Sequence, residues 1–198
     1  MPLTEIPDRR PQHLRDVRYR SFSRPDGLWD IEGELHDSKA ADQVFHGNRH
    51  VPAGTAIHHM WIRATVDTTL RVQAIEVAMD SHPLGHCPEA NAALQRMVGC
   101  QMGRGWRKSI QEHLGGVASC THLRELLFNM ATAAFQSMPG VFAGDDPEQP
   151  PRHLGQCLGW DFSGPGVATY YPQFVRWDAD ARAARSAPAD RAAAQKSA

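Results

Sequence analysis

The stretch that decides the fold is IHHMWIRATV at residues 57–66, followed by the second apolar run LRVQAIEVAM at residues 70–79. In the first run Met60, Ile62, Ala64 and Val66 recur at every second position, as in a strand with one buried face. Residues 67–69, DTT, supply turn chemistry between the runs. We therefore expect an antiparallel hairpin, and the same alternation places His58 on its inward face.

A second hairpin is predicted upstream. Residues 17–22 alternate in the strand manner, RPDG at 24–27 is a turn sequence, and LWDIEGEL at 28–35 resumes the alternation. Residues 37–54 are rich in turn formers and are expected to form a loop between the hairpins. Two hairpins in succession predict an antiparallel sheet.

The pattern becomes helical after Pro83. Apolar residues recur at spacings of three and four in three runs, and glycines end the first two of them. The runs are Ala90 to Val98, Trp106 to Leu114, and Leu123 to Ala134. The sequence therefore predicts an α+β domain in which three helices pack on one face of a sheet made of two hairpins.

Composition divides the chain into four parts. Residues 1–14 read as an irregular lead-in and residues 15–138 as the α+β domain. Residues 139–177 read as a linker followed by an aromatic segment that covers the domain. Residues 178–198, rich in Ala, Arg, Asp and Ser, are expected to be a disordered tail.

Charge and cysteine content exclude several classes of function. The 198 residues carry a formal net charge of -1, which gives no overall attraction to nucleic acid or to an anionic membrane. We interpret the arginines at residues 9–24 as a solvated strand face rather than an RNA-binding arm. The chain shows neither a signal sequence nor an apolar run of about 20 residues, so we expect a cytoplasmic protein. Its 4 scattered cysteines are expected to remain thiols.

Three residues are predicted to hold a divalent ion, zinc or iron. Cys120 precedes the third helical run, where free N–H groups and the helix dipole favour a thiolate. Cys87 lies at a turn before the first helical run, and His58 lies at a strand start. Cysteine and histidine sets are typical of zinc and iron sites. The alternative is that both cysteines are small buried side chains and His58 is a hydrogen-bonded core histidine.

Two further residues are catalytic candidates. His122 is either a fourth ligand or an acid/base group. Side chains two positions apart on a helix diverge by about 200°, so Cys120 and His122 can share one ion only if Cys120 belongs to the loop. We therefore favour an acid/base role for His122. Glu76 is a general base if it faces the site and a solvent-facing carboxylate if it does not. The sequence leaves its face open.

Several motifs resemble a bacterial family catalogued as domain of unknown function 2889. The resemblance covers residues 18–136 and rests on RPDGLWDIEG at 24–33, IHHM at 57–60, Cys87, GW at 105–106 and CTHL at 120–123. More distantly, the order of strands, helices and cysteines is similar to NifU-type iron–sulfur scaffold proteins. That likeness implies a NifU-like core with Cys87 and Cys120 as metal or cluster ligands. The chain has no cysteine beside His58, which favours a permanent single ion over a labile cluster.

These observations lead to three functional hypotheses. The first is a metal-dependent enzyme, of lyase or hydrolase type, acting on a small aromatic or otherwise apolar organic substrate. The second is a non-catalytic metal or iron–sulfur carrier that docks onto a partner. The third is an interaction domain without a metal. Neither the reaction nor the oligomeric state follows from the sequence.

Overall fold

The chain folds into two units, Met1–Met138 and Pro139–Ala198, and paired strands form the framework of the first. The computed structural model describes residues 3–4, 6–138 and 148–176. The predicted tail at 178–198 and most of the predicted linker lie outside the described residues.

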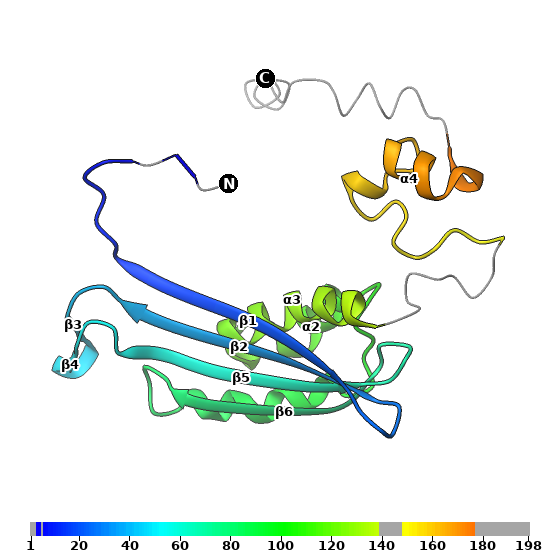
Figure 1. Cartoon of the computed structure of the whole chain (residues 1–198). Helices are drawn as coiled ribbons and strands as arrows, with labels where there is room; N and C mark the ends of the chain where they lie inside the picture. Colours follow the sequence, from blue (N-terminus) through cyan, green and yellow to red (C-terminus); the bar gives the residue numbers. More distant parts are fainter. Residues whose placement is uncertain (1–2, 5, 139–147, 177–198) are drawn as a thin grey trace, which may run out of the picture. The chain divides into compact units, whose positions relative to one another are not determined.

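The first unit contains a four-stranded antiparallel sheet (Figure 1). Its strands are β1 (His13–Ser23), β2 (Trp29–Lys39), β5 (Ala56–Val66) and β6 (Val72–Ser81), in the order β1-β2-β5-β6. Both predicted hairpins are confirmed, and pairing of β2 with β5 joins them into one sheet. In the second hairpin the Asp67 carboxylate accepts the N–H groups of Thr69 and Arg71 at 2.8 and 3.1 Å, which holds the turn closed.

The segment between the hairpins is more ordered than the sequence predicts. Strand β2 continues to Lys39, and β3 (Gln43–Phe45) pairs with β4 (Arg49–Val51) across a 3-10 turn at His46–Asn48. The chain reverses there because Gly47 and Asn48 adopt left-handed backbone angles, with φ of 73° and 59°. The extension of β2 carries Asp37 into the sheet.

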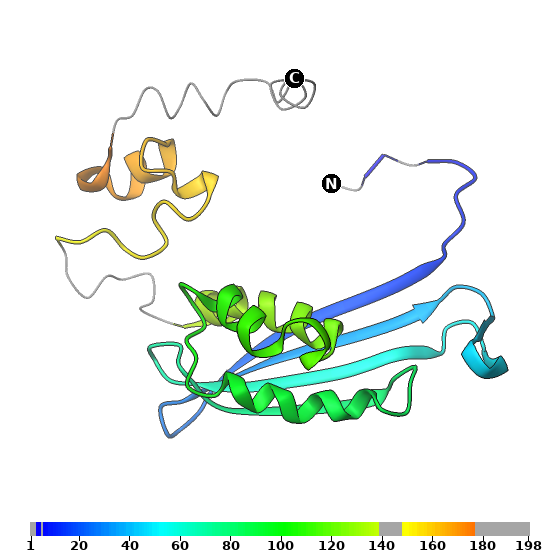
Figure 2. The same ribbon diagram turned by 180° about the vertical axis from the view of Figure 1, so that it is seen from behind.

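Helical segments follow the sheet in the predicted order. The first is a 3-10 turn at Cys87–Glu89, α1 at Ala90–Ala93 and a second 3-10 turn at Leu94–Met97. Helices α2 (Trp106–Leu114) and α3 (Thr121–Ser137) come next, and all of these segments lie on the same side of the sheet (Figure 2). The fold is therefore α+β, with a four-stranded antiparallel sheet and several helices.

Helix α3 approaches β2 closely at Gly33. A β-carbon at Gly33 would lie 3.0 Å from Cγ of Leu126, so the absence of a side chain lets the helix rest on the strand. The Tyr19 hydroxyl donates to the Leu126 carbonyl at 3.2 Å, and the Trp106 indole N–H donates to the Leu127 carbonyl at 2.9 Å. These contacts fix the position of the second turn of α3 relative to the sheet.

The opposite face of the sheet is polar and solvent-exposed. Arg20 lies 3.5 Å from Glu32, Arg63 lies 2.9 Å from Glu76, and Arg18 lies 4.0 Å from Glu34. Two arginines of the predicted basic segment thus lie on a solvated strand face. Their charges are compensated by neighbouring carboxylates on the same face.

The second unit contains a 3-10 turn at Leu158–Trp160, α4 (Pro165–Tyr170) and a 3-10 turn at Pro172–Phe174. His153 is buried, and its ring lies 4.7 Å from that of Trp160 and 5.4 Å from that of Tyr171. Aromatic side chains of this segment therefore pack against one another. A covering role for the segment stays a prediction.

Candidate functional site

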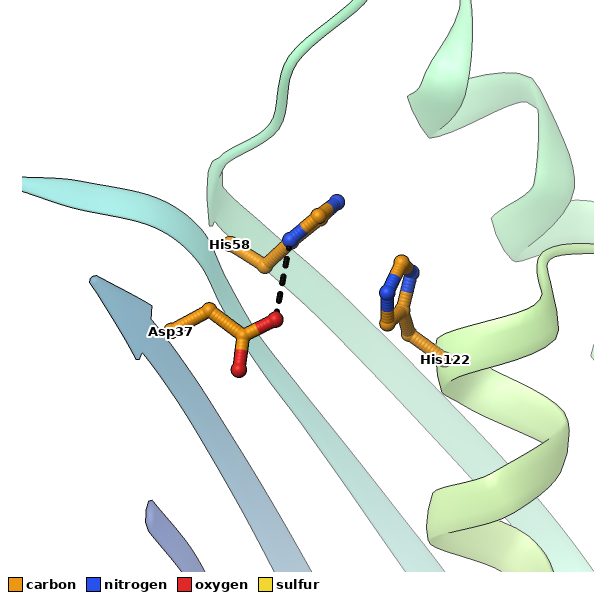
Figure 3. Close-up of side chains that lie close together, drawn as sticks. All are labelled: Asp37, His58 and His122. Atoms are coloured by element: carbon orange, nitrogen blue, oxygen red, sulfur yellow. Dashed lines mark hydrogen bonds and ion pairs between the residues drawn. The ribbon is translucent and has the colours of Figure 1, made fainter. Parts of the chain in front are cut away.

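Three side chains converge at one end of the sheet (Figure 3). Asp37 comes from the end of β2, His58 from the start of β5 and His122 from the first turn of α3. One potential ligand atom of each lies within 4.8 Å of the other two, and the described residues contain no other group of three with this closeness. The cluster Asp37–His58–His122 is the candidate site.

Strand register brings these side chains together. Asp37 lies directly opposite Arg15 of β1 and directly opposite His58 of β5. Because side chains alternate between faces, all three point to the face covered by the helices. His122 reaches Asp37 and His58 from the helix layer, since the close contact of α3 with Gly33 sets the distance between the helix and the sheet.

Asp37 is an ionised carboxylate in a buried position. Its residue is only 1% exposed, and both of its oxygens accept 2.7 Å hydrogen bonds from Arg15. Burial raises the pKa of Asp37, but the hydrogen bonds and charge of Arg15 outweigh it, so the pKa lies below its ordinary value. His58 and His13 add contacts at 3.1 and 3.5 Å. These donors occupy most of the acceptor capacity of a carboxylate, so Asp37 orients its neighbours.

Burial favours the neutral forms of the two histidines. Nδ1 of His58 donates to the Asp37 carboxylate, which leaves Nε2 with a free lone pair. Burial lowers the pKa of His58, and the nearby His122 lowers it further, against the opposing effect of Asp37. Burial, with the charge of Arg15, also lowers the pKa of His122. The rings face each other with centroids 3.9 Å apart, and neutral imidazole is the form that binds metals.

Cys120 stands next to this pair. It is the residue before α3, with an extended backbone (φ -82°, ψ 135°), so it belongs to the loop and not to the helix. Its Sγ lies 3.6 Å from Nδ1 of His122. Two ligands of one tetrahedral zinc, at about 2.3 Å for sulfur and about 2.05 Å for nitrogen, are about 3.5 Å apart. The loop position that Cys120 needs in order to share an ion with His122 is therefore present. Among the described residues, however, Cys120 does not form a group of three within 4.8 Å with His58 and His122.

The other predicted site residues lie elsewhere. Cys87 is partly buried at the start of the 3-10 turn after β6, and among the described residues it is not part of the cluster. Glu76 lies opposite Arg63 on the solvent face, with its side chain 70% exposed and 2.9 Å from the Arg63 guanidinium. His58 points to the other face. The solvent-facing alternative for Glu76 is therefore what the structure shows, and this carboxylate does not reach the cluster.

Asp37 and Arg15 were missed by the sequence analysis. The predicted strand ended at Leu35, yet the inward positions Ile31, Gly33 and Leu35 continue by alternation to Asp37. A predicted strand longer by two residues would have placed the Asp37 carboxylate on the inward face. Arg15 required the register between β1 and β2, which no local pattern supplies.

Comparison with protein-family models places the chain in a family. A model described as "Protein of unknown function (DUF2889)" matches residues 13–136, and the chain belongs to this family. No curated protein and no solved structure matches the chain. The likeness to NifU-type scaffolds is therefore without support. Among the described residues no helix has the length and apolar character needed to cross a membrane.

Proposed function

We propose that this protein is a metal-dependent enzyme whose divalent ion, zinc or iron, is held by His58, His122 and the Cys120 thiolate. The observation that carries the proposal is the convergence of His58 and His122 with Asp37 within 4.8 Å. Cys120 lies outside this group of three, and its place as third ligand is inferred from its 3.6 Å contact with His122. The donor set fits such an ion, because two neutral imidazoles and a thiol at a helix start are typical zinc and iron ligands. A role for Cys87 stays a prediction from the sequence.

Asp37 supports this site without occupying it. A carboxylate that accepts the second N–H of a histidine ligand fixes its tautomer and orientation, and His58 has this relation to Asp37 at 3.1 Å. Arg15 in turn neutralises the buried carboxylate and reaches Glu125 at 3.0 Å. The row Arg15–Asp37–His58 therefore keeps one imidazole lone pair directed at the candidate ion position.

Three protein ligands leave one coordination position for water or substrate. A divalent ion there would polarise a substrate oxygen or lower the pKa of a bound water. This open position favours catalysis over a purely structural role. A small organic substrate remains part of the proposal, and its aromatic character rests only on the composition of the second unit.

The carrier hypothesis is less well supported by the same contacts. Iron–sulfur clusters are held by several thiolates, whereas Cys120 is the cysteine in contact with His122 in the described residues. Two imidazoles and one thiolate suit a single ion. The hypothesis of a metal-free interaction domain is separated from both by metal analysis.

The test is the metal content of the full-length protein, purified without a histidine tag and measured by mass spectrometry of the elements. We expect a stoichiometric zinc or iron in the wild type and its loss in His58→Ala, His122→Ala and Cys120→Ser. His59→Ala and Cys157→Ser are matched controls, since His59 is adjacent on β5 but bonded to Glu34, and Cys157 is exposed in the second unit. A wild type without metal, or metal retained in all three site variants, contradicts the proposal.

A further inference from the structure

Strand β1 is an edge of the sheet with one side open. It pairs with β2 along 11 residues, and in the described part of the chain its other side has no paired strand (Figure 1). Most of its residues are exposed, including Leu14, Val17 and Phe22 at 56%, 44% and 47%. Open strand edges are templates for pairing with another chain. We propose that β1 pairs antiparallel with β1 of a second copy of this protein.

The backbone groups available for this pairing can be identified. The Ala40 N–H donates to the Gln12 carbonyl, and His13 lies opposite Lys39. Even-numbered residues of β1 therefore direct their N–H and C=O groups toward β2, and odd-numbered residues direct theirs to the open edge. A second β1 must consequently align odd residues with odd residues.

Charge selects one register among those that remain. With the two-fold axis through Val17, Asp16 lies opposite Arg18 of the second copy, and Arg18 lies opposite the second Asp16. These pairs occupy non-hydrogen-bonded positions, where facing side chains are closest. An axis through Arg18 would instead set two arginines opposite each other. That axis would also set Asp16 opposite Arg20, so of the two registers the one about Val17 pairs opposite charges without placing two arginines opposite each other.

The side chains at this edge are free to make these contacts. Asp16 is exposed and has no ion-pair partner in the described part of the chain, and the Arg18 side chain is 70% exposed with Glu34 at 4.0 Å. Of two hollows on the surface, one, of about 330 Å³, lies around His50 and His82. The second, of about 280 Å³, is lined by Asp16, Val17, Arg18, Glu34 and His36. This second hollow lies over the paired strands β1 and β2, next to the two charged side chains of the proposed contact.

The experiment is sedimentation analysis of the full-length protein and of two charge reversals, Asp16→Arg and Arg18→Asp. We expect a dimer for the wild type and a dissociation constant raised about tenfold to hundredfold in each variant, because each reversal sets two like-charge pairs opposite each other. Glu112→Arg and Lys108→Glu, on the exposed side of α2, change the net charge equally and should leave the dimer intact.

Mixing the two variants tests the register itself. Asp16→Arg facing Arg18→Asp restores both opposite-charge pairs, so the mixture should form heterodimers, detected by native mass spectrometry. The doubly reversed chain, Asp16→Arg with Arg18→Asp, should regain the wild-type dimer. A monomeric wild type, a dimer insensitive to both reversals, or a mixture without heterodimers would overturn the proposal.

Discussion

Replacing Asp37 by Asn removes the negative charge on which Arg15 and His58 converge, and its effect can be worked out from the contacts. The carboxylate accepts two bonds of 2.7 Å from Arg15 and one of 3.1 Å from His58. Asparagine keeps one accepting oxygen, but its NH2 group must face a donor on Arg15 or His58. At least one charge-assisted bond is therefore lost, and a guanidinium loses its counter-charge.

Breaking a buried ion pair by removing one partner costs about 3–5 kcal/mol. The Arg15 side chain is 34% exposed and keeps its contact with Glu125, so water and Glu125 compensate part of that loss. We expect the free energy of unfolding of the metal-free protein to fall by about 2–3 kcal/mol in Asp37→Asn. Urea denaturation at neutral pH, with a chelator present to exclude stabilisation by a ligand, measures it directly.

The matched control is Glu34→Gln on the same strand. Glu34 faces solvent and lies 3.1 Å from His59, so its pairs are surface pairs and the loss should stay below about 1 kcal/mol. A double-mutant cycle with Arg15→Met should show that Asp37 and Arg15 are strongly coupled. Equal losses in the two variants, or additivity of Asp37→Asn and Arg15→Met, would refute the reasoning.

Two further predictions concern the pH dependence and the packing of α3. Burial lowers the pKa of His58 and His122, so on acidification the unfolded state takes up protons before the folded state does. Their contribution to the stability of the fold is therefore complete above about pH 6.5 and declines below it. The lowered pKa of Asp37 adds a further loss of stability below about pH 3.9. Urea midpoints across this range should show the decline, and an unchanged slope in His58→Asn/His122→Asn would argue against the assignment. Gly33→Val should lower stability by about 2 kcal/mol because the added atoms meet Leu126 and Tyr19, whereas Ala78→Val on the solvent face should have little effect. Thermal unfolding distinguishes the two variants, and equal melting temperatures would contradict close packing at Gly33.

The sheet was predictable because its strands carry a strong two-residue alternation. The inward row Met60, Ile62, Ala64 and Val66 identified β5, and it placed His58 on the helix-covered face, where the structure has it. The stripe from Leu123 to Ala134 identified α3 in the same way. Local periodicity was sufficient wherever one face of an element is buried.

The site was only partly predictable because it depends on contacts between distant segments. The alternation at His58 and the helix start at Cys120 were visible locally, but Asp37 lies in a segment whose turn-forming composition hid the end of β2. Arg15 is separated from Asp37 by 22 residues and from Glu125 by 110, so its role depends on register and helix placement. Glu76 could not be assigned to a face, since the alternation of β6 is weaker than that of β5.

The row Arg15–Asp37–His58 also affects how the sheet finds its alignment. A slip of β1 by one residue against β2 would turn Arg15 to the solvent face and leave the Asp37 carboxylate buried without its counter-charge. The same slip between β2 and β5 would separate Asp37 from His58. Misaligned sheets are thus penalised by the very groups that form the candidate site. Correct assembly of three strands and formation of the site are therefore one event, and the state of the site reports on the folding of the sheet.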